Sequence, residues 1–206
     1  MRSSKQEAII RLDHIAYRVA NREKTVKFFM DALGYTFQTE FDLEFADGTT
    51  CDCTALEPPE KHPMITNHYW VKRINDGLAI PITPEVAKEN PHDELHLPPE
   101  IFVSEGQPGS IVADWVAARN GVGGIHHLAY QVDDVKATMA EWVEKGYAEF
   151  TSDKPMECPG LTQVFTKPSE LTGVIYEFIT RSGYGFCKEN VRGLMESTVG
   201  VGVDGK

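Results

Sequence analysis

The feature that most constrains the fold of this 206-residue chain is an internal repeat. Residues 12–19 read LDHIAYRV and residues 125–132 read IHHLAYQV, so that His14 aligns with His127. Such a repeat predicts two copies of one structural unit, each of which buries its apolar surface fully only beside its neighbour. We therefore expect two similar modules that share a core.

Each repeated segment is followed by a pattern typical of an amphipathic helix. The first helix is predicted from Asn21 to Gly34 and the second from Asp133 to Gly146. Asn and Asp are favourable N-cap residues, and Gly readily adopts the left-handed conformation that ends many helices. Both segments also repeat apolar residues at the spacing of one helix face, namely Val26, Phe29, Met30, Leu33, Val135, Met139, Trp142 and Val143.

Short runs that predict strands follow each helix. They cover residues 35–45, 51–56 and 101–104 in the first half, and residues 161–166 and 174–180 in the second. Each half therefore reads β-α-β-β-β. The predicted fold class is α+β, with two modules whose sheets lie side by side and form a metal-binding cleft.

The predicted boundaries are 10–116 for the first module, 117–182 for the second and 185–199 for a C-terminal helix. Residues 58–99 have no counterpart in the second half and carry most of the prolines, so they are interpreted as an insertion within the first module. A strand pair around the Asn-Asp-Gly sequence at 75–77 is expected in this insertion. A mostly disordered loop is the alternative.

Composition and charge limit the classes of binding partner that are expected. The net charge is −11 and Lys and Arg are scattered, whereas nucleic-acid binding requires a basic face. No apolar run approaches the ~20 residues that span a bilayer, and residues 1–10 lack the apolar segment of a signal peptide. The four cysteines include no CxxC pair, which argues against a zinc knuckle. We expect a cytoplasmic protein with a small-molecule substrate, and no nucleic-acid or membrane partner.

Three side chains are candidate ligands of one divalent ion. Strand alternation directs His14 and Ala16 to one face, toward the cleft, and the repeat directs His127 the same way. Glu177 stands among apolar strand residues, where a carboxylate is costly to bury unless it is paired or bound to a cation. Two imidazoles and a carboxylate suit Fe(II), Mn(II), Co(II) or Zn(II). His126 is expected to face the other way, and hydrogen-bonded core histidines are the alternative interpretation.

The repeated segments and the VIYEFIT strand at 174–180 resemble the vicinal oxygen chelate superfamily. The two repeats alone would suit methylmalonyl-CoA epimerases. Residues 101–116 and 163–181 resemble the catalytic half of the 4-hydroxyphenylpyruvate dioxygenases, and residues 185–197 resemble the C-terminal helix that closes over their active site. The resemblance covers nearly the whole chain except residues 58–99.

The resemblance implies roles for particular residues. His14, His127 and Glu177 match the iron ligands of the dioxygenases, and Gln163 and Phe165 match residues that line the substrate pocket. In those enzymes a 2-oxo acid chelates Fe(II) and O2 takes the remaining position. The implied cofactor is one divalent ion, most simply Fe(II), with Co, Mn, Zn and Ni left open. A homodimer is suggested by the resemblance alone.

Three positions depart from the dioxygenase pattern. Ser104 stands where Asn is usual, His126 where Gln precedes the second His ligand, and Val191 where a Phe stacks on the aromatic substrate. We assign these residues to the substrate pocket. They predict a non-haem Fe(II) dioxygenase that acts on a small 2-oxo acid or related chelating substrate other than 4-hydroxyphenylpyruvate.

Two other functions stay open. A divalent-metal epimerase, isomerase or lyase would need a carboxylate to move a proton, and Glu100 is the candidate catalytic residue, although a solvated residue at the start of a strand is the simpler interpretation. A ligand-sequestering protein is the third class, but such relatives typically lack a complete set of three ligands. The sequence names neither the substrate nor the metal that is loaded.

Overall fold

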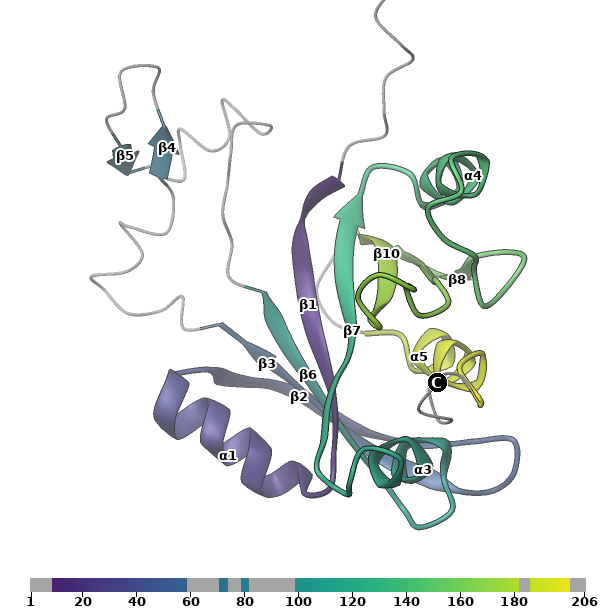
Figure 1. The fold of residues 1–206 in the computed structure, drawn as a ribbon. Coiled ribbons are helices and arrows are strands. Elements are labelled where there is room, and N and C mark those ends of the chain that lie inside the picture. Colours follow the sequence, from purple (N-terminus) through teal and green to yellow (C-terminus); the bar gives the residue numbers. More distant parts are fainter. Residues whose placement is uncertain (1–8, 59–70, 74–78, 82–98, 182–185, 201–206) are drawn as a thin grey trace, which may run out of the picture.

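The computed structural model describes residues 9–58, 71–73, 79–81, 99–181 and 186–200. It contains an eight-stranded sheet, a two-stranded sheet and four described helices (Figure 1). In chain order the elements are β1 (Ile9–Val19), α1 (Arg22–Leu33), β2 (Thr36–Glu44), β3 (Thr50–Glu57), β4 (Val71–Arg73), β5 (Ala79–Pro81), β6 (Glu100–Gly106), α3 (Ile111–Ala117), β7 (Gly123–Val132), α4 (Val135–Glu144), β8 (Met156–Cys158), β9 (Leu161–Phe165), β10 (Ile175–Arg181) and α5 (Lys188–Glu196).

The large sheet is built from the two predicted repeats. Its strand order is β2-β3-β6-β1-β7-β10-β9-β8, so each half has the same internal order and the halves meet at the antiparallel pair β1 and β7. In both halves the first strand pairs in parallel with the last one, β1 with β6 and β7 with β10. The α+β class with paired β-α-β-β-β units is therefore confirmed, whereas the exact module boundaries stay a prediction.

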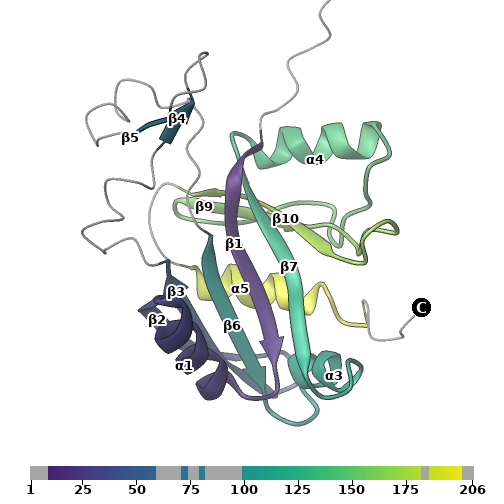
Figure 2. The ribbon, with the colours of Figure 1, turned by 60° about the vertical axis from the view of Figure 1, so that its left-hand side comes forward.

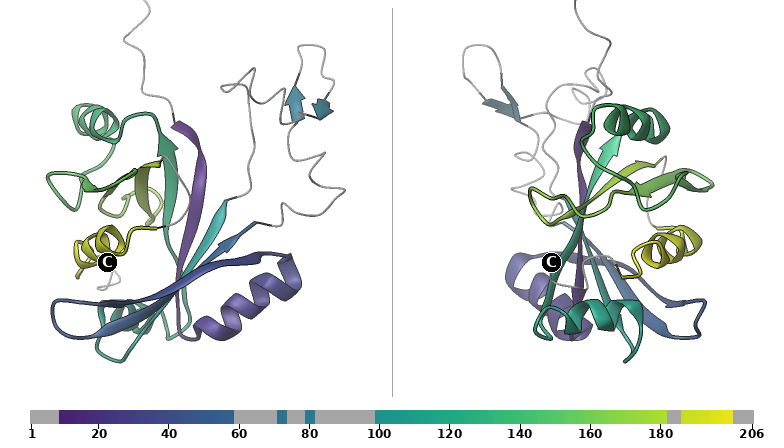
Figure 3. Two further views of the ribbon diagram at one scale, coloured as in Figure 1. Left: turned by 180° about the vertical axis from the view of Figure 1, so that it is seen from behind. Right: turned by 45° about the vertical axis from the view of Figure 1, so that its right-hand side comes forward.

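The helices lie on different sides of this curled sheet. α1 contacts β3 and β6, and α4 contacts β9 and β10, so each covers its own module. α5 contacts β2 of the first half and β8 and β9 of the second, and it therefore spans the concave side between the modules (Figure 2). The views in Figure 3 show the same separation of α5 from α1 and α4.

The predicted caps of α1 are confirmed, because Asn21 accepts a hydrogen bond from the Lys24 N–H and Gly34 ends the helix with φ 75°. The caps of α4 are each shifted by one residue: the N-cap is Asp134, which accepts from the N–H groups of Lys136 and Ala137, and the C-cap is Lys145. The predicted apolar stripes are only partly covered in the described structure. Within α1, Phe29 is buried, while Met30 and Leu33 are 37% and 48% exposed.

Little of the proposed insertion lies within the described residues. β4 and β5 form an antiparallel pair with Val71 opposite Pro81, which confirms the expected strand pair. The rest of residues 59–98 lies outside the part of the chain that the structure describes. Among the described residues, no helix is long and apolar enough to cross a membrane.

Strand β1 separates two environments. Ile15, Tyr17 and Val19 pack with Phe29 of α1 on the outer side. His14, Ala16 and Arg18 point to the opposite side, which is the concave face under α5, and all three are at most 3% exposed. The predicted alternation is confirmed, and it places a histidine and an arginine on the same buried face.

Candidate metal centre and its cavity

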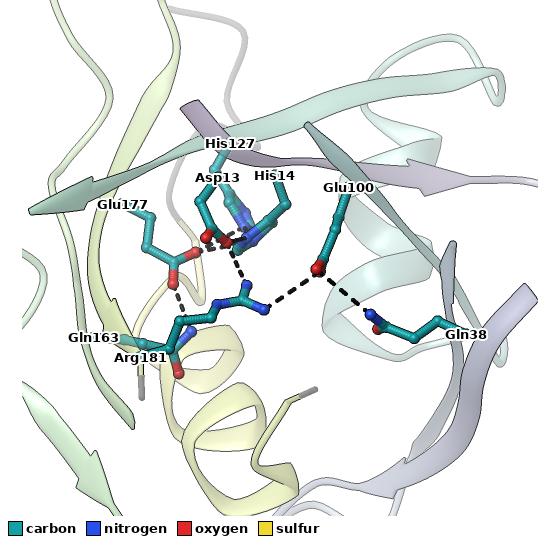
Figure 4. Close-up of polar contacts among 8 residues, drawn as sticks. All are labelled: Asp13, His14, Gln38, Glu100, His127, Gln163, Glu177 and Arg181. Carbon is teal, nitrogen blue, oxygen red and sulfur yellow. Dashed lines mark hydrogen bonds and ion pairs between the residues drawn. The ribbon is translucent and has the colours of Figure 1, made fainter. Parts of the chain in front are cut away.

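The structure brings His14, His127 and Glu177 together on the concave face of the sheet (Figure 4). The Nε2 atoms of His14 and His127 lie 3.3 and 3.0 Å from the Glu177 Oε2 atom, and 3.3 Å from each other. All three side chains are buried. One nitrogen from each imidazole and one carboxylate oxygen therefore point at a common centre.

Strand register explains why residues 163 positions apart meet. His14 on β1 lies opposite Ala129 on β7, and Ala129 lies beside Glu177 on β10. Ala16 in turn lies opposite His127. The two alanines are at most 3% exposed, and their small side chains leave space above the sheet into which the three longer side chains converge.

A second layer of polar contacts holds two of these ligands. His14 Nδ1–H donates to Asp13 Oδ1 at 2.9 Å, and Asp13 forms an ion pair with Arg181 (Figure 4). Gln163 Nε2 donates to Glu177 Oε1 at 2.6 Å. A histidine that donates its remote nitrogen to a carboxylate is fixed in the tautomer that offers the other nitrogen to a metal. Asp13 thus orients His14, and Gln163 orients Glu177.

The charges of the cluster are strongly coupled. Burial by itself would lower the pKa of His14, but the carboxylates of Glu177 and Asp13 raise it to about 9. Burial would raise the pKa of Glu177, but the two imidazoles hold it far below its usual range. For His127, burial outweighs Glu177 and lowers the pKa. A proton on His14 thus balances the buried carboxylate, and a divalent cation could replace that proton.

These donors fit a divalent metal ion. Each residue offers one ligand atom, and all three atoms lie within 4.8 Å of one another. Two imidazole nitrogens and one carboxylate oxygen on one side of an ion are the donor set of non-haem iron sites, and they also suit Mn, Co and Zn. Among the described residues this is the one cluster of His, Cys, Asp and Glu with such geometry.

A narrow cavity lies against the cluster, between the sheet and α5, with about 20 Å³ of space for the centre of a water-sized sphere. The five residues assigned to the substrate pocket all line it, namely Ser104, His126, Gln163, Phe165 and Val191. The Ser104 hydroxyl donates to the Tyr17 carbonyl oxygen at 3.2 Å, so its hydrogen is used within the sheet. The structure therefore brings these five residues together at one cavity, while their role as a substrate pocket stays a prediction.

The expectation that His126 faces away from the cleft was wrong. Along β7 the partner of Ala16 is His127 and the partner of Tyr17 is Ile125, so His126 is an extra residue in the ladder. Such a β-bulge interrupts the alternation of side chains. As a result His126 also lines the cavity, and its Nδ1 atom lies 2.9 Å from the Nδ1 atom of His127.

Glu100, the candidate catalytic residue, interacts with two polar side chains outside the cavity. It lies beside His14 in the sheet. Its carboxylate accepts hydrogen bonds from Arg181 Nη1 and from Gln38 Nε2, each at 3.4 Å (Figure 4). It is not among the described residues that line the cavity. The geometry therefore favours a role in holding Arg181, which in turn holds Asp13, over proton transfer at a substrate.

The C-terminal segment contributes residues of α5 to the lining of the cavity beside the cluster. Cys187 is the N-cap residue of α5, and Asn190 lies inside the helix and donates to the Met156 carbonyl oxygen. The ring centroid of Phe186 lies 5.1 Å from that of His14. Phe186 was not among the predicted site residues, although it lies in the segment that the resemblance assigns to closing the site.

Arg18, Asp13 and Arg181 were also missed. Strand alternation could have identified Arg18, because it lies four residues after His14 on the same face. Asp13 faces the other way by simple alternation, and a register shift between Leu12 and His14 on β1 accompanies its contact with His14. Arg181 had no local signal, because its partners come from β1 and β6.

Comparisons with known proteins agree with this architecture. A mutant of 4-hydroxymandelate synthase from Streptomyces coelicolor aligns with a TM-score of 0.63 and 18% identity over 92% of this chain and 53% of that one. The chain therefore spans about half the length of that synthase. Methylmalonyl-CoA epimerase from Mycobacterium tuberculosis aligns with a TM-score of 0.56 and 16% identity over 88% of this chain and 95% of that one. These likenesses show a shared fold.

A search of curated proteins found no match. The family model of the Glyoxalase/Bleomycin resistance protein/Dioxygenase superfamily matches residues 13–162, which is more than half of the chain. Members of this superfamily are usually enzymes and typically bind a divalent metal, in keeping with the His-His-Glu cluster described above. With the paired modules and the family match together, the chain belongs to the Glyoxalase/Bleomycin resistance protein/Dioxygenase superfamily.

Proposed function

We propose that this protein is an Fe(II)-dependent dioxygenase that acts on a small 2-oxo acid. The observation that carries the proposal is the donor set: two imidazoles and one carboxylate, offered from one side within a mostly apolar cavity. This arrangement leaves several adjacent metal positions for other ligands. It is the donor set typical of non-haem iron oxygenases.

The repeat supports a site with three protein ligands. Glu177 lies beside Ala129, and the equivalent neighbour of Ala16 in the first half is Phe102. The first module therefore contributes His14 and an apolar ring where the second contributes His127 and a carboxylate. A chelating substrate and O2 together need the positions that a fourth protein ligand would occupy.

The cavity lining also favours oxygen chemistry over proton transfer. An epimerase or isomerase needs a base within hydrogen-bond reach of the carbon acid. Apart from the three ligands, the titratable residues in the described lining of the cavity are Tyr17, Arg18 and His126, and Tyr17 packs with Phe29 on the outer side of β1. No carboxylate other than Glu177 faces it among these residues, because Glu100 is held by Arg181.

The walls would exclude water from the reacting groups. They consist mainly of apolar side chains, namely Phe102, Phe165, Phe186, Val191, Leu194 and Met195. A dry cavity strengthens electrostatic contacts and limits side reactions. When bound, Fe(II) would accept two oxygens of the 2-oxo acid as a chelating ligand and would supply the means to activate O2. The chain would hold the ion through His14, His127 and Glu177, orient Glu177 through Gln163, and shape the cavity through α5.

The test is metal content combined with oxygen uptake. The protein is loaded with Fe(II) without oxygen and then mixed with oxygenated buffer and a panel of 2-oxo acids, while O2 consumption and CO2 release are followed. We expect uptake and decarboxylation to be coupled with at least one acid. His127→Ala, which removes one of three ligands, should lose stoichiometric iron and all uptake while retaining the circular dichroism spectrum of the folded protein.

Two results would contradict the proposal. Exchange of a substrate α-proton with D2O, without oxygen uptake, would indicate an epimerase or isomerase. Full iron occupancy in His127→Ala would show that the ligand set is wrong. Rapid, coupled conversion of 4-hydroxyphenylpyruvate to homogentisate would overturn the narrower prediction that Val191, Ser104 and His126 select a different acid.

A further inference from the structure

Arg18 is a buried arginine with unused hydrogen-bond donors. The residue is 2% exposed, and it lines the cavity on the same face of β1 as His14. Its Nη2 atom donates to Thr198 Oγ1 at 3.1 Å, whereas its Nε and Nη1 atoms have no partner. Among the described residues, no carboxylate pairs with its guanidinium group.

This arrangement is costly for the protein by itself. A buried charge without a partner loses its hydration and receives no Coulombic compensation. The surroundings of Arg18 compensate little: the Trp115 ring lies 5.8 Å from its Cζ atom, and the buried thiols of Cys51 and Cys53 lie nearby. Burial lowers the pKa of Arg18 to about 9, so the group still carries its charge at neutral pH. An arginine held in this way suits an anion that arrives from outside.

His126 adds a further buried nitrogen without a partner at the same cavity. Its Nδ1 atom lies 2.9 Å from the Nδ1 atom of His127. Its Nε2 atom is buried and has no hydrogen-bond partner among the described residues. Arg18 and His126 thus both line the cavity with nitrogen atoms that lack a partner.

Strand register separates Arg18 from the His-His-Glu cluster along β1. Arg18 lies opposite Gly124 on β7 and Ser104 on β6, two rungs beyond the row that contains Ala16 and His127. The Cα atoms of His14 and Arg18 are separated by four residues of strand, or about 13 Å. The His-His-Glu cluster and Arg18 therefore lie at different positions along β1, and both belong to the lining of the cavity.

We propose that Arg18, assisted by His126, binds a carboxylate at the end of the substrate remote from the metal, so that the substrate is a small 2-oxo diacid. The chelating end of this assignment rests on the proposed function, whereas the carboxylate end rests on Arg18. A carboxylate matches the planar fork of a guanidinium with two parallel hydrogen bonds. One carboxylate also balances one buried positive charge, whereas a phosphate dianion would leave excess charge in the cavity.

The test measures binding, which needs no turnover. The protein is loaded with Zn(II), which carries no redox chemistry, and dissociation constants are measured by calorimetry for matched pairs of equal length. 2-Oxoadipate is compared with 2-oxohexanoate, and 2-oxoglutarate with 2-oxopentanoate; each pair differs only by a terminal carboxylate in place of a methyl group. We expect the diacid to bind about 100-fold more tightly in at least one pair, as buried charged hydrogen bonds allow. A phosphonate-tipped 2-oxo acid of the same length should bind more weakly than the diacid.

The variant Arg18→Met removes the charge and keeps much of the side-chain volume. It should bind both members of each pair equally, and its ligand-free form should melt about 2–4 °C higher than the wild type, because an unpaired buried charge is gone. Arg18→Lys should keep a reduced preference, because the ammonium group offers no planar fork. The matched control is Arg119→Gln, which removes a nearby positive charge that does not line the cavity; it should keep the full preference.

Each contrary result has a defined meaning. Equal affinity of diacid and monoacid in the wild type would overturn the assignment, as would a preference that persists in Arg18→Met. A lower melting temperature of Arg18→Met with unchanged selectivity would show that Arg18 is purely structural. If Arg18→Met does not fold, the affinities of the wild type and of Arg18→Lys for the matched ligand pairs still test the assignment. A diacid preference with Zn(II), but no oxygen uptake with Fe(II), would support this inference and refute the dioxygenase proposal.

Discussion

At His14, a single buried side chain depends on groups from three other places in the sequence. Its Nε2 atom faces Glu177, and its Nδ1 atom is held by Asp13, which is held by Arg181. Arg181 is in turn paired with Glu100. This chain of contacts fixes the ring, so changes behind the ligand should be felt at the metal.

We predict that Asp13→Asn weakens metal binding about 10-fold, at the lower end of the range for groups that orient a ligating histidine. The amide keeps the shape and one acceptor but loses the charge. Asp31→Asn is the control, because Asp31 is 61% exposed and pairs with Lys27 far from the cluster. Competition with a chromophoric chelator gives both affinities. Equal affinities of Asp13→Asn and the wild type would show that Asp13 does not orient His14.

The raised pKa of His14 predicts proton release on metal binding. A ligating histidine must be neutral, and in the ion-free protein the carboxylates of Glu177 and Asp13 raise the pKa of His14 to about 9 despite burial. Close to one proton per ion should therefore leave at pH 7, and this number should fall as the pH rises through about 9. Calorimetry in buffers of different ionisation enthalpy counts the protons. No release at pH 7 would contradict the assignment.

The same shift has a consequence for the ion-free protein. Because the folded pKa of His14 lies above its ordinary value of 6.5, the protonated ring contributes stability that is fully present below about pH 6.5. This contribution is lost as the pH rises through about 9. A bound divalent ion removes the dependence, because it takes the place of the proton.

At the scale of elements, α5 covers the concave face of the sheet and forms one wall of the cavity. The helix has nine residues, a length that is marginal in isolation, so it persists through the burial of Val191, Leu194 and Met195. Phe186, just before it, lies against His14 and Phe102. All four side chains line the cavity over the cluster.

We predict that truncation after Arg181 leaves metal binding within about threefold of the wild type, because all three ligands and Gln163 precede the cut, while oxygen uptake falls at least 10-fold as water enters the site. Iron content and oxygen uptake are measured on the same preparation, and the ligand-free fold is checked by circular dichroism. Undiminished uptake by the truncated protein would show that α5 does not shape the site.

At the scale of the whole molecule, the strands on either side of residues 59–98 pair directly with each other. Leu56 at the end of β3 pairs with Ile101 near the start of β6, so the two strands have the antiparallel arrangement of a β-hairpin. Replacement of residues 58–99 by Asn-Gly, which favours a two-residue hairpin turn, should give a folded protein that still binds one divalent ion. Loss of the circular dichroism spectrum or of the ion would show that the segment belongs to the core. The homodimer and the cytoplasmic location stay predictions.

The sequence by itself determined the repeat and therefore the paired modules, because aligned histidines, helix caps and strand patterns are local or periodic signals. It also indicated His14, His127 and Glu177 as a set, through strand alternation and the cost of burying a lone carboxylate. Tertiary structure decided the rest. A β-bulge, which strand alternation does not predict, directs His126 toward the cavity. The pairing of β6 and β10 with the central strands brings Glu100 next to Arg181, so that its carboxylate pairs with the guanidinium group and does not face a substrate. Only the packing of α5 over β1 showed that Arg18 is buried without an acidic partner, because burial and pairing depend on residues distant in the chain.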